Sequence, residues 1–276
     1  MRVRGWAARG RGGELSIESD IIRPMLVDSH THLLRLKASP EEAVHEAAEA
    51  GVGAIVNIGT NIEDSREGMR LAAATANVYS VAGIHPHNAS DHSTGNLEAL
   101  SEMASSGGIV ALGEVGLDYY RNHSSADAQK ALFEDVVSLA NEVRLPVVIH
   151  TREAFDDTMD ILRCARVPIV LHCFEGGEKE IEEARERDYF IGLTGNVTYK
   201  KSETANHLHL INPERLMVET DAPYLSPEPL RGKPNFPKNV VHTASFVAEK
   251  LGMGEEEFAT LTTRNARNFY RLPLEV

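Results

Sequence analysis

The chain has 276 residues, of which 42% are apolar, so it can bury one large core and has the usual size of a single α/β barrel. Its formal net charge of −13 argues against a protein that coats nucleic acid non-specifically, because such binding depends on many Lys and Arg contacts to phosphate. The same charge permits one deep site in which bound divalent cations reverse the local potential.

The stretch that precedes the first apolar run is rich in Arg and Gly at its start. It lacks the apolar periodicity needed to dock on a core, so we predict a disordered extension over residues 1–24 and a single folded domain over residues 25–276. Acidic residues at Glu14, Glu18 and Asp20 argue against a mitochondrial presequence. An alternative interpretation is that the natural chain starts at Met25.

From Met25 onward, short apolar runs alternate with amphipathic stretches, a pattern typical of successive βα units and a parallel sheet. Each apolar run has the length of a strand. The runs begin at Met25, Ala54, Val78, Ile109, Pro146, Pro168, Tyr189 and Leu216. Eight units favour a closed (β/α)8 barrel, the TIM barrel of the α/β class, over an open doubly wound sheet.

Helix signals fall between these runs. Ser39 is placed to cap a helix whose first position is Pro40, and Gly51 is placed to end it. The longest predicted helix covers residues 126–144, and its broad apolar stripe should pack on the barrel. After the last strand come a Pro-rich loop and two helices near residues 240–251 and 255–268.

The carboxyl ends of the predicted strands carry imidazoles and carboxylates, and active sites of such barrels lie at these ends. His30 and His32 are two residues apart in an extended chain, so their side chains face the same side. An isolated His-x-His pair arises readily by chance, whereas a joint pattern over five strands does not. The candidate metal ligands are His30, His32, Glu114, His150, His172 and Asp221.

Six ligands exceed the four that a tetrahedral structural zinc uses, and they suit two divalent ions that share a bridging carboxylate. Two ions can lower the pKa of a bound water and stabilise both oxygens of an in-line displacement. Mixed His and carboxylate ligands suit zinc or manganese, while magnesium prefers oxygen and water. The sequence therefore predicts two divalent ions and leaves Zn, Mn and Mg open.

Longer motifs surround these residues in a fixed order. They are DSHTHL (28–33), GIHPH (83–87), GEVGLDYY (113–120), PVVIHTREA (146–154), LHCF (171–174), ETDAPYL (219–225), RGKPN (231–235) and NARNF (265–269). With these motifs the chain closely resembles the TatD family of metal-dependent hydrolases from about residue 25 to about residue 270. It departs from the family pattern at Glu175, where the family has serine, and at Phe236, where it has glutamate.

The resemblance implies a (β/α)8 barrel and a division of the ligands between two metals. His30, His32, Glu114 and Asp221 would hold one metal; Glu114, His150 and His172 would hold the other, with Glu114 as the bridge. Asp221 would also orient the attacking water and accept its proton, so Asp221 and Glu114 are the predicted catalytic residues. The usual activity of the family is exonucleolytic trimming of DNA in the 3'-5' direction.

Other residues near the predicted mouth are candidates for substrate contact. His85 ends the third strand and is placed to contact a phosphate or a third ion. Glu219 shares the inward face with Asp221, either as an extra ligand or as a hydrogen-bonded buried carboxylate. Tyrosines at 119, 120 and 224 either stack on bases or pack in loops. Cations that either grip phosphate or remain solvated loop charges are Arg121, Arg152, Lys200, Arg231 and Lys233.

We therefore predict a metal-dependent hydrolase that uses an activated water, with DNA or another phosphate ester as substrate. The alternative is a dimetal amidohydrolase or esterase acting on a small amide, lactone or carboxylic ester, because activated hydroxide also attacks carbonyl carbon. A non-catalytic barrel would lack some of the ligands, and none is missing. The sequence contains no GxSxG, GxxxxGK[ST] or GxGxxG motif, which argues against serine catalysis and nucleotide-triphosphate hydrolysis.

The sequence also bears on cellular location. No apolar run approaches the ~18 residues of a membrane span, so we expect no membrane association. The two cysteines, Cys164 and Cys173, are too few for a disulfide framework and suit a reducing compartment. We therefore expect a cytoplasmic protein, monomeric or weakly oligomeric, with both cysteines as buried free thiols.

Overall fold

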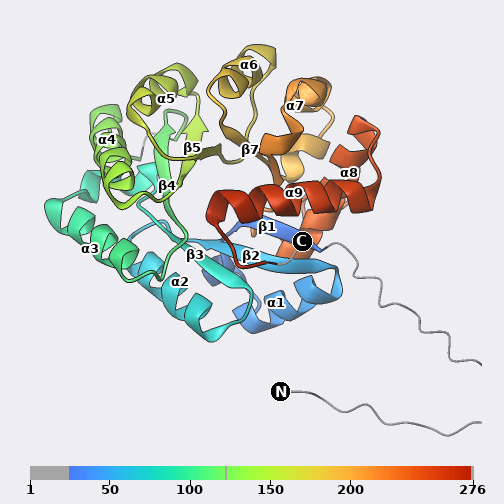
Figure 1. Ribbon diagram of the computed structural model, residues 1–276, viewed down its shortest axis with the longest axis horizontal. Coiled ribbons are helices and arrows are strands. Elements are labelled where there is room, and N and C mark those ends of the chain that lie inside the picture. The colour runs from blue at the N-terminus through green and yellow to red at the C-terminus, as the bar shows by residue number, and fades with distance from the viewer. Residues whose placement is uncertain (1–24, 122, 275–276) are drawn as a thin grey trace, which may run out of the picture.

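The computed structural model describes residues 25–121 and 123–274 (Figure 1). The predicted N-terminal extension, residues 1–24, lies outside the described residues. Within the described ranges, no helix is both long enough and apolar enough to cross a membrane.

The core of the molecule is one sheet of eight strands whose spatial order follows the chain, with each strand parallel to the next. Every predicted apolar run contains a strand. The strands are β1 (Leu26–Thr31), β2 (Val52–Ile58), β3 (Val78–Ala82), β4 (Ala111–Asp118), β5 (Val147–Arg152), β6 (Ile169–Leu171), β7 (Phe190–Leu193) and β8 (Leu216–Val218). The (β/α)8 barrel prediction is confirmed.

Helices surround the sheet on its outer side (Figure 1). They are α1 (Pro40–Glu49), α2 (Ile62–Ala74), α3 (Thr94–Ser105), α4 (Ala126–Val143), α5 (Phe155–Ile161), α6 (Glu178–Glu186), α7 (Thr204–His207), α8 (Val240–Leu251) and α9 (Glu255–Tyr270). The three long helices predicted from the sequence match α4, α8 and α9 within two residues. As predicted, Ser39 caps α1, since its side chain accepts a hydrogen bond from Glu42 N at 3.2 Å.

A seam between the first and last strands closes the barrel. Asp221 N donates to His30 O, and His32 N donates to Ala222 O, each at 2.9 Å. Below them the buried carboxylate of Asp28 accepts bonds from Thr220 N at 2.8 Å and Thr220 Oγ1 at 2.6 Å. The seam therefore places Asp221 beside His30, although the two residues are far apart in the chain.

The opposite end of the barrel is filled by apolar side chains. Inward residues such as Ala111 and Phe190 begin their strands and join one buried cluster with Phe269 and Tyr270 of α9. The ring centroids of Phe190 and Phe269 lie 5.1 Å apart in an edge-to-face arrangement, which aromatic pairs prefer. Thr263 Oγ1 donates to Met25 O at 2.6 Å, just before β1. Helix α9 thus covers the amino ends of the strands.

The two cysteines are both free, but they differ in exposure. Cys173 is partly buried after β6. Cys164 is exposed, so the prediction that both thiols are buried is wrong for this residue. It ends the short 3-10 turn Leu162–Cys164, which follows α5 at the surface of the barrel.

Candidate metal centre

Two of the strands that carry candidate ligands are irregular at those residues. The pairing register of β1 with β2 shifts between Asp28 and Thr31, and that of β4 with β5 shifts between Leu112 and Val115. Such bulges re-aim side chains and are common beside active sites. In β4, Gly113 has φ +127°, and a Cβ there would collide with the carbonyl oxygen of Val148. The irregular strands present His30 and Glu114 to the centre of the mouth.

Glu114 lies in the middle of the cluster, and its two oxygens face different imidazoles. Oε2 lies 3.6 Å from His30 Nε2 and 3.8 Å from His32 Nε2. Oε1 faces a second set, with His150 Nδ1 at 2.8 Å, His85 Nε2 at 3.5 Å and His172 Nε2 at 3.7 Å. Burial raises the pKa of Glu114, but the surrounding imidazoles hold it well below its usual value. One ionised carboxylate therefore lies between two groups of nitrogen ligands.

Asp221 completes the first group. Its Oδ1 lies 3.3 Å from His32 Nε2 and 3.8 Å from His30 Nε2. The backbone of Asp221 has φ +54°, a left-handed conformation that is uncommon for residues other than glycine and that clusters at functional sites. Burial raises the pKa of Asp221, but His32, His172 and His30 lower it below its usual value. The carboxylate is therefore ionised beside the imidazoles.

His30 tests whether a divalent cation fits this cluster. Both ring nitrogens are buried and have no hydrogen-bond partner among the described residues, and Glu114 Oε2 lies 3.6 Å from Nε2. Burial, followed by the charge on His172, lowers the pKa of His30, so the ring is neutral and offers a lone pair. A buried polar atom without a partner costs about 1–3 kcal/mol, and a metal ion would supply the missing partner. The donor chemistry of His30 therefore fits a metal ion.

Carboxylates also hold the outer nitrogens of the second group. His172 Nδ1 lies 2.6 Å from Glu219 Oε1, and His150 Nε2 lies 3.2 Å from Asp118 Oδ2. Burial lowers the pKa of His172, but Glu219 and Glu114 raise it to about 9. In the neutral form of each ring, the outer N–H donates to the carboxylate and the inner nitrogen, which faces Glu114, carries a lone pair that an ion could bind. This arrangement orients imidazole ligands in many metal sites.

Sequence reasoning missed Asp118 and left the role of Glu219 open. Besides His150, Asp118 Oδ2 pairs with His87 Nε2 at 2.9 Å, and Asp118 Oδ1 accepts a bond from Arg121 N at 2.8 Å. Burial raises the pKa of Asp118, but these hydrogen bonds hold it below its usual range. Residues an even number of positions apart in an extended strand face the same side. Asp118 follows Glu114 by four residues in β4, so this spacing was the sequence signal that could have identified it.

The predicted substrate contacts are distributed unevenly. His85 lies within the cluster. The guanidinium of Arg152 lies 4.0 Å from the ring centroid of Tyr120, and that of Arg121 lies 5.4 Å from the same ring. Arg231 lies over a different ring, that of Tyr199, at 4.1 Å. Lys233 is exposed in the loop after β8 and makes no ion pair with any described residue. The three arginines therefore rest on aromatic rings, whereas the lysine does not.

A (β/α)8 barrel with imidazoles and carboxylates gathered at the carboxyl ends of its strands defines a class of metal-dependent hydrolases. Residues 27–271 match the profile of the family described as TatD related DNase. Because this match covers most of the chain, the protein belongs to the TatD-related DNase family, and it is a metal-dependent hydrolase.

Individual relatives agree with this assignment. The chain is 34% identical over 254 residues to the uncharacterized metal-dependent hydrolase YabD of Bacillus subtilis, covering 90% of this chain and 100% of that protein. It is 36% identical to the 3'-5' ssDNA/RNA exonuclease TatD of Citrobacter rodentium, covering 85% and 93%. The crystal structure of YjjV, a TatD homologue from Escherichia coli, superposes with a TM-score of 0.84 at 28% identity, covering 90% and 98%.

Proposed function

We propose that this chain hydrolyses phosphodiester bonds of single-stranded nucleic acid, DNA in particular, and releases nucleotides from the 3' end. The observation that carries the proposal is the position of Glu114, whose two oxygens face separate groups of imidazoles. The relative named as a 3'-5' ssDNA/RNA exonuclease supports the choice of substrate. We assign this activity to one hydrolase domain over residues 25–276, and the free cysteines favour a cytoplasmic location.

The cluster has enough donors for two divalent ions. Its mixed imidazole and carboxylate donors suit Zn or Mn better than Mg, which prefers oxygen ligands and water. His30, His32, Glu114 and Asp221 would hold one ion. Glu114, His150 and His172 would hold the other, so that Glu114 bridges the two. Bound there, the pair would supply an activated water and stabilise charge on the attacking and leaving oxygens.

Asp221 is the proposed proton acceptor. Its carboxylate is ionised because His32 and His172 offset the effect of burial on its pKa. A general base has to lie within hydrogen-bonding reach of the water that it deprotonates. Asp221 faces the same two imidazoles that Glu114 Oε2 faces, so a water activated in the proposed site would lie beside its carboxylate.

His85 has a tautomer that suits hydrogen bonding to the substrate better than metal binding. His87 N donates to His85 Nδ1 at 3.1 Å, so Nδ1 carries the lone pair. Burial lowers the pKa of His85 to about 3, so the ring is neutral at pH 7 and its proton lies on Nε2. This Nε2–H group faces the cluster, 3.5 Å from Glu114 Oε1. We assign it to a phosphoryl oxygen of the substrate and not to a third ion.

The test is a nuclease assay with the full chain, single-stranded DNA labelled at the 5' end, and Zn, Mn or Mg supplied in turn. We expect a ladder of products that shorten from the 3' end and about two ions per chain by metal analysis. Small amides, lactones and carboxylic esters are assayed in parallel. Turnover of one of these with no cleavage of DNA under any metal would replace the nuclease with the amidohydrolase or esterase alternative.

A further inference from the structure

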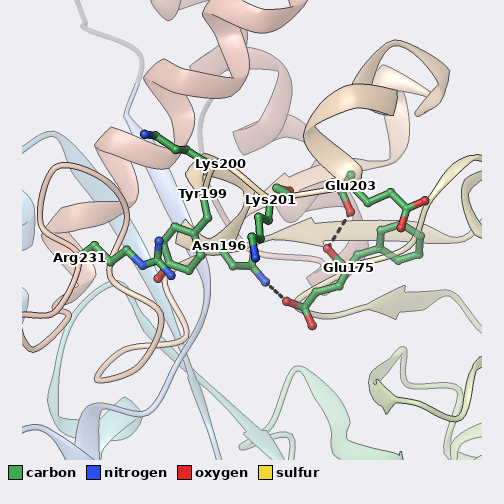
Figure 2. Close-up of a pocket in the computed structure, with 10 residues that line it drawn as sticks. Glu175, Asn196, Tyr199, Lys200, Lys201, Glu203 and Arg231 are labelled. Atoms are coloured by element: carbon green, nitrogen blue, oxygen red, sulfur yellow. Dashed lines mark hydrogen bonds between the residues drawn. The ribbon is translucent and has the colours of Figure 1, made fainter.

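A cavity of about 650 Å³ is formed by the segments that follow β6, β7 and β8, at the end of the barrel that carries the metal cluster (Figure 2). Phe174 and Asn196 contribute to its lining, and the charged side chains along it are Lys200, Lys201, Arg231, Glu175 and Glu203. None of these residues belongs to the proposed metal site. The cavity therefore needs an explanation of its own.

A short segment of the chain connects the lining of the cavity to the metal cluster. Glu175 follows His172 by three residues, so their Cα atoms lie within about 11 Å of each other. Asn196 Nδ2 donates to Glu175 Oε1 at 2.9 Å (Figure 2). The same nitrogen lies 3.5 Å from Cys173 Sγ. Asn196 thereby links the loop after β7 to the segment that carries His172. A strand of nucleic acid cleaved at the cluster would extend over this boundary.

Charge distinguishes this cavity from its neighbour. Phe174 and Glu175 also line a second cavity of about 590 Å³, which contains five carboxylates and only two cations, Arg152 and Lys179. The first cavity contains three cations and two carboxylates. In a chain with a net charge of −13, a polyanion is repelled from most of the surface, so the first cavity is the more favourable path.

The cations of the first cavity are available for a ligand. Within the described residues, neither Lys200 nor Lys201 lies within 4.0 Å of a carboxylate, and Figure 2 shows Lys201 extending toward Asn196. Among the same residues, Arg231 has one distant ion-pair partner, Glu228, at 3.8 Å. Its guanidinium lies 4.1 Å from the ring centroid of Tyr199, whose hydroxyl donates to Ser226 O at 2.9 Å. The hydroxyl bond anchors the ring on which the guanidinium lies.

We propose that this cavity is the subsite for the part of the single strand that remains after the terminal nucleotide is released, with Lys201 binding a backbone phosphate and the Arg231–Tyr199 stack receiving a base. Guanidinium planes and aromatic rings are the usual platforms for unpaired bases, and lysine contacts phosphate as a point charge. This inference rests on the proposed nuclease function and adds where the retained chain lies.

The experiment compares thymidine dinucleotide and tetranucleotide as substrates of the metal-loaded full chain. In the wild type, kcat/KM should rise by at least about fivefold from the shorter to the longer substrate, since a stacked base contributes roughly 1–3 kcal/mol. Lys201→Gln should reduce this ratio and lower the slope of log kcat/KM against log salt by about 0.7, the value for one phosphate contact in a single strand. Arg231→Lys should reduce the ratio while the salt slope is kept, because the charge remains and the planar group is lost.

Lys179→Gln is the matched control, because it removes the same charge from the neighbouring cavity, where Lys179 pairs with Asp156 at 3.3 Å. It should leave both the ratio and the salt slope unchanged. A wild-type enzyme that cleaves both substrates equally well, or a ratio that survives in Lys201→Gln and Arg231→Lys, would overturn the subsite. If neither oligonucleotide is cleaved, the nuclease function itself fails, and the two results are therefore distinguishable.

Discussion

The two ends of the barrel bury side chains of opposite character. At the carboxyl ends of the strands, His30, Glu114 and Asp221 lie in contact with other ionisable groups, and both ring nitrogens of His30 lack a partner among the described residues. At the amino ends, Phe269 and Tyr270 of α9 fill the interior with apolar contacts. Burial of the polar groups at one end lowers the stability of the fold, and a bound metal ion would offset this cost. Burial of apolar side chains at the other end stabilises the fold and contributes no reactive group.

The largest effect should come from Glu114→Gln, at the centre of the polar end. The amide retains one oxygen but replaces the other with a donor, so one of the two imidazole groups loses its shared acceptor. Both turnover and metal content should fall, the metal content to one ion or fewer per chain. Elemental analysis together with the nuclease assay measures both quantities. A variant that keeps two ions and full turnover would show that Glu114 does not bridge.

Asp221→Asn should separate rate from binding. The amide can still offer an oxygen to an ion but cannot accept a proton, so turnover should fall by about 10²–10⁴-fold while at least one metal remains bound. The same assays apply, with thermal unfolding as a check on the fold. Near-wild-type rates on phosphodiesters and carboxylic esters, with metal occupancy unchanged, would show that Asp221 is not the proton acceptor.

At the apolar end, Phe269→Ala should affect stability alone. Phe269 is 1% exposed and packs against Phe190 and Tyr270, so its truncation should lower the free energy of unfolding by about 3–5 kcal/mol. Urea denaturation measures this change. The rate per folded molecule should stay at the wild-type value. A loss of rate in fully folded variant protein would contradict the separation of the two ends.

The stability of the metal-free protein should depend on pH through the polar end of the barrel. Burial lowers the pKa of His172, but Glu219 and Glu114 raise it to about 9, above its ordinary value of about 6.5. The bound proton therefore stabilises the folded metal-free protein fully below about pH 6.5, and this contribution disappears as the pH rises through about 9. Because a metal competes with the proton, apparent metal affinity should increase over that range by up to about tenfold per pH unit.

Titration calorimetry at several pH values measures the affinity, and thermal unfolding with chelator present measures the stability. The Phe269→Ala protein is the control, because its stability should be lower at every pH but should change with pH in the same way. An affinity that is independent of pH would mean that His172 carries no proton in the metal-free state.

The smallest effect concerns Tyr270, which connects the two ends. Its hydroxyl donates to Ser29 O at 3.0 Å, directly before His30. Tyr270→Phe should cost about 1 kcal/mol of stability, the value of one buried hydrogen bond. Urea denaturation measures the change in stability, and the nuclease assay measures the change in rate. A fall in rate larger than the fall in stability can explain would show that the apolar end also orients His30.

The sequence was sufficient for the barrel, because strand length and helix punctuation are local properties. It was also sufficient to place His150 and Glu114 at the same end, because parallel strands share an orientation. It was not sufficient for Asp118 or for the tautomer of His85, since these depend on which ring nitrogen faces which neighbouring strand. Tyr199, whose ring lies beneath the Arg231 guanidinium, was missed for the same reason. Tyr119, which the sequence offered for stacking, instead donates its hydroxyl to Asp157.

The seam has a consequence for the order in which the molecule assembles. The bonds between Asp28 and Thr220 join residues 192 positions apart, and contacts of such high sequence separation form late because a long loop has to close first. Asp221 meets His30 and His32 only when those bonds exist. A folding chain would therefore acquire the complete set of proposed metal donors only at barrel closure, and uptake of a metal ion during refolding should mark that last step.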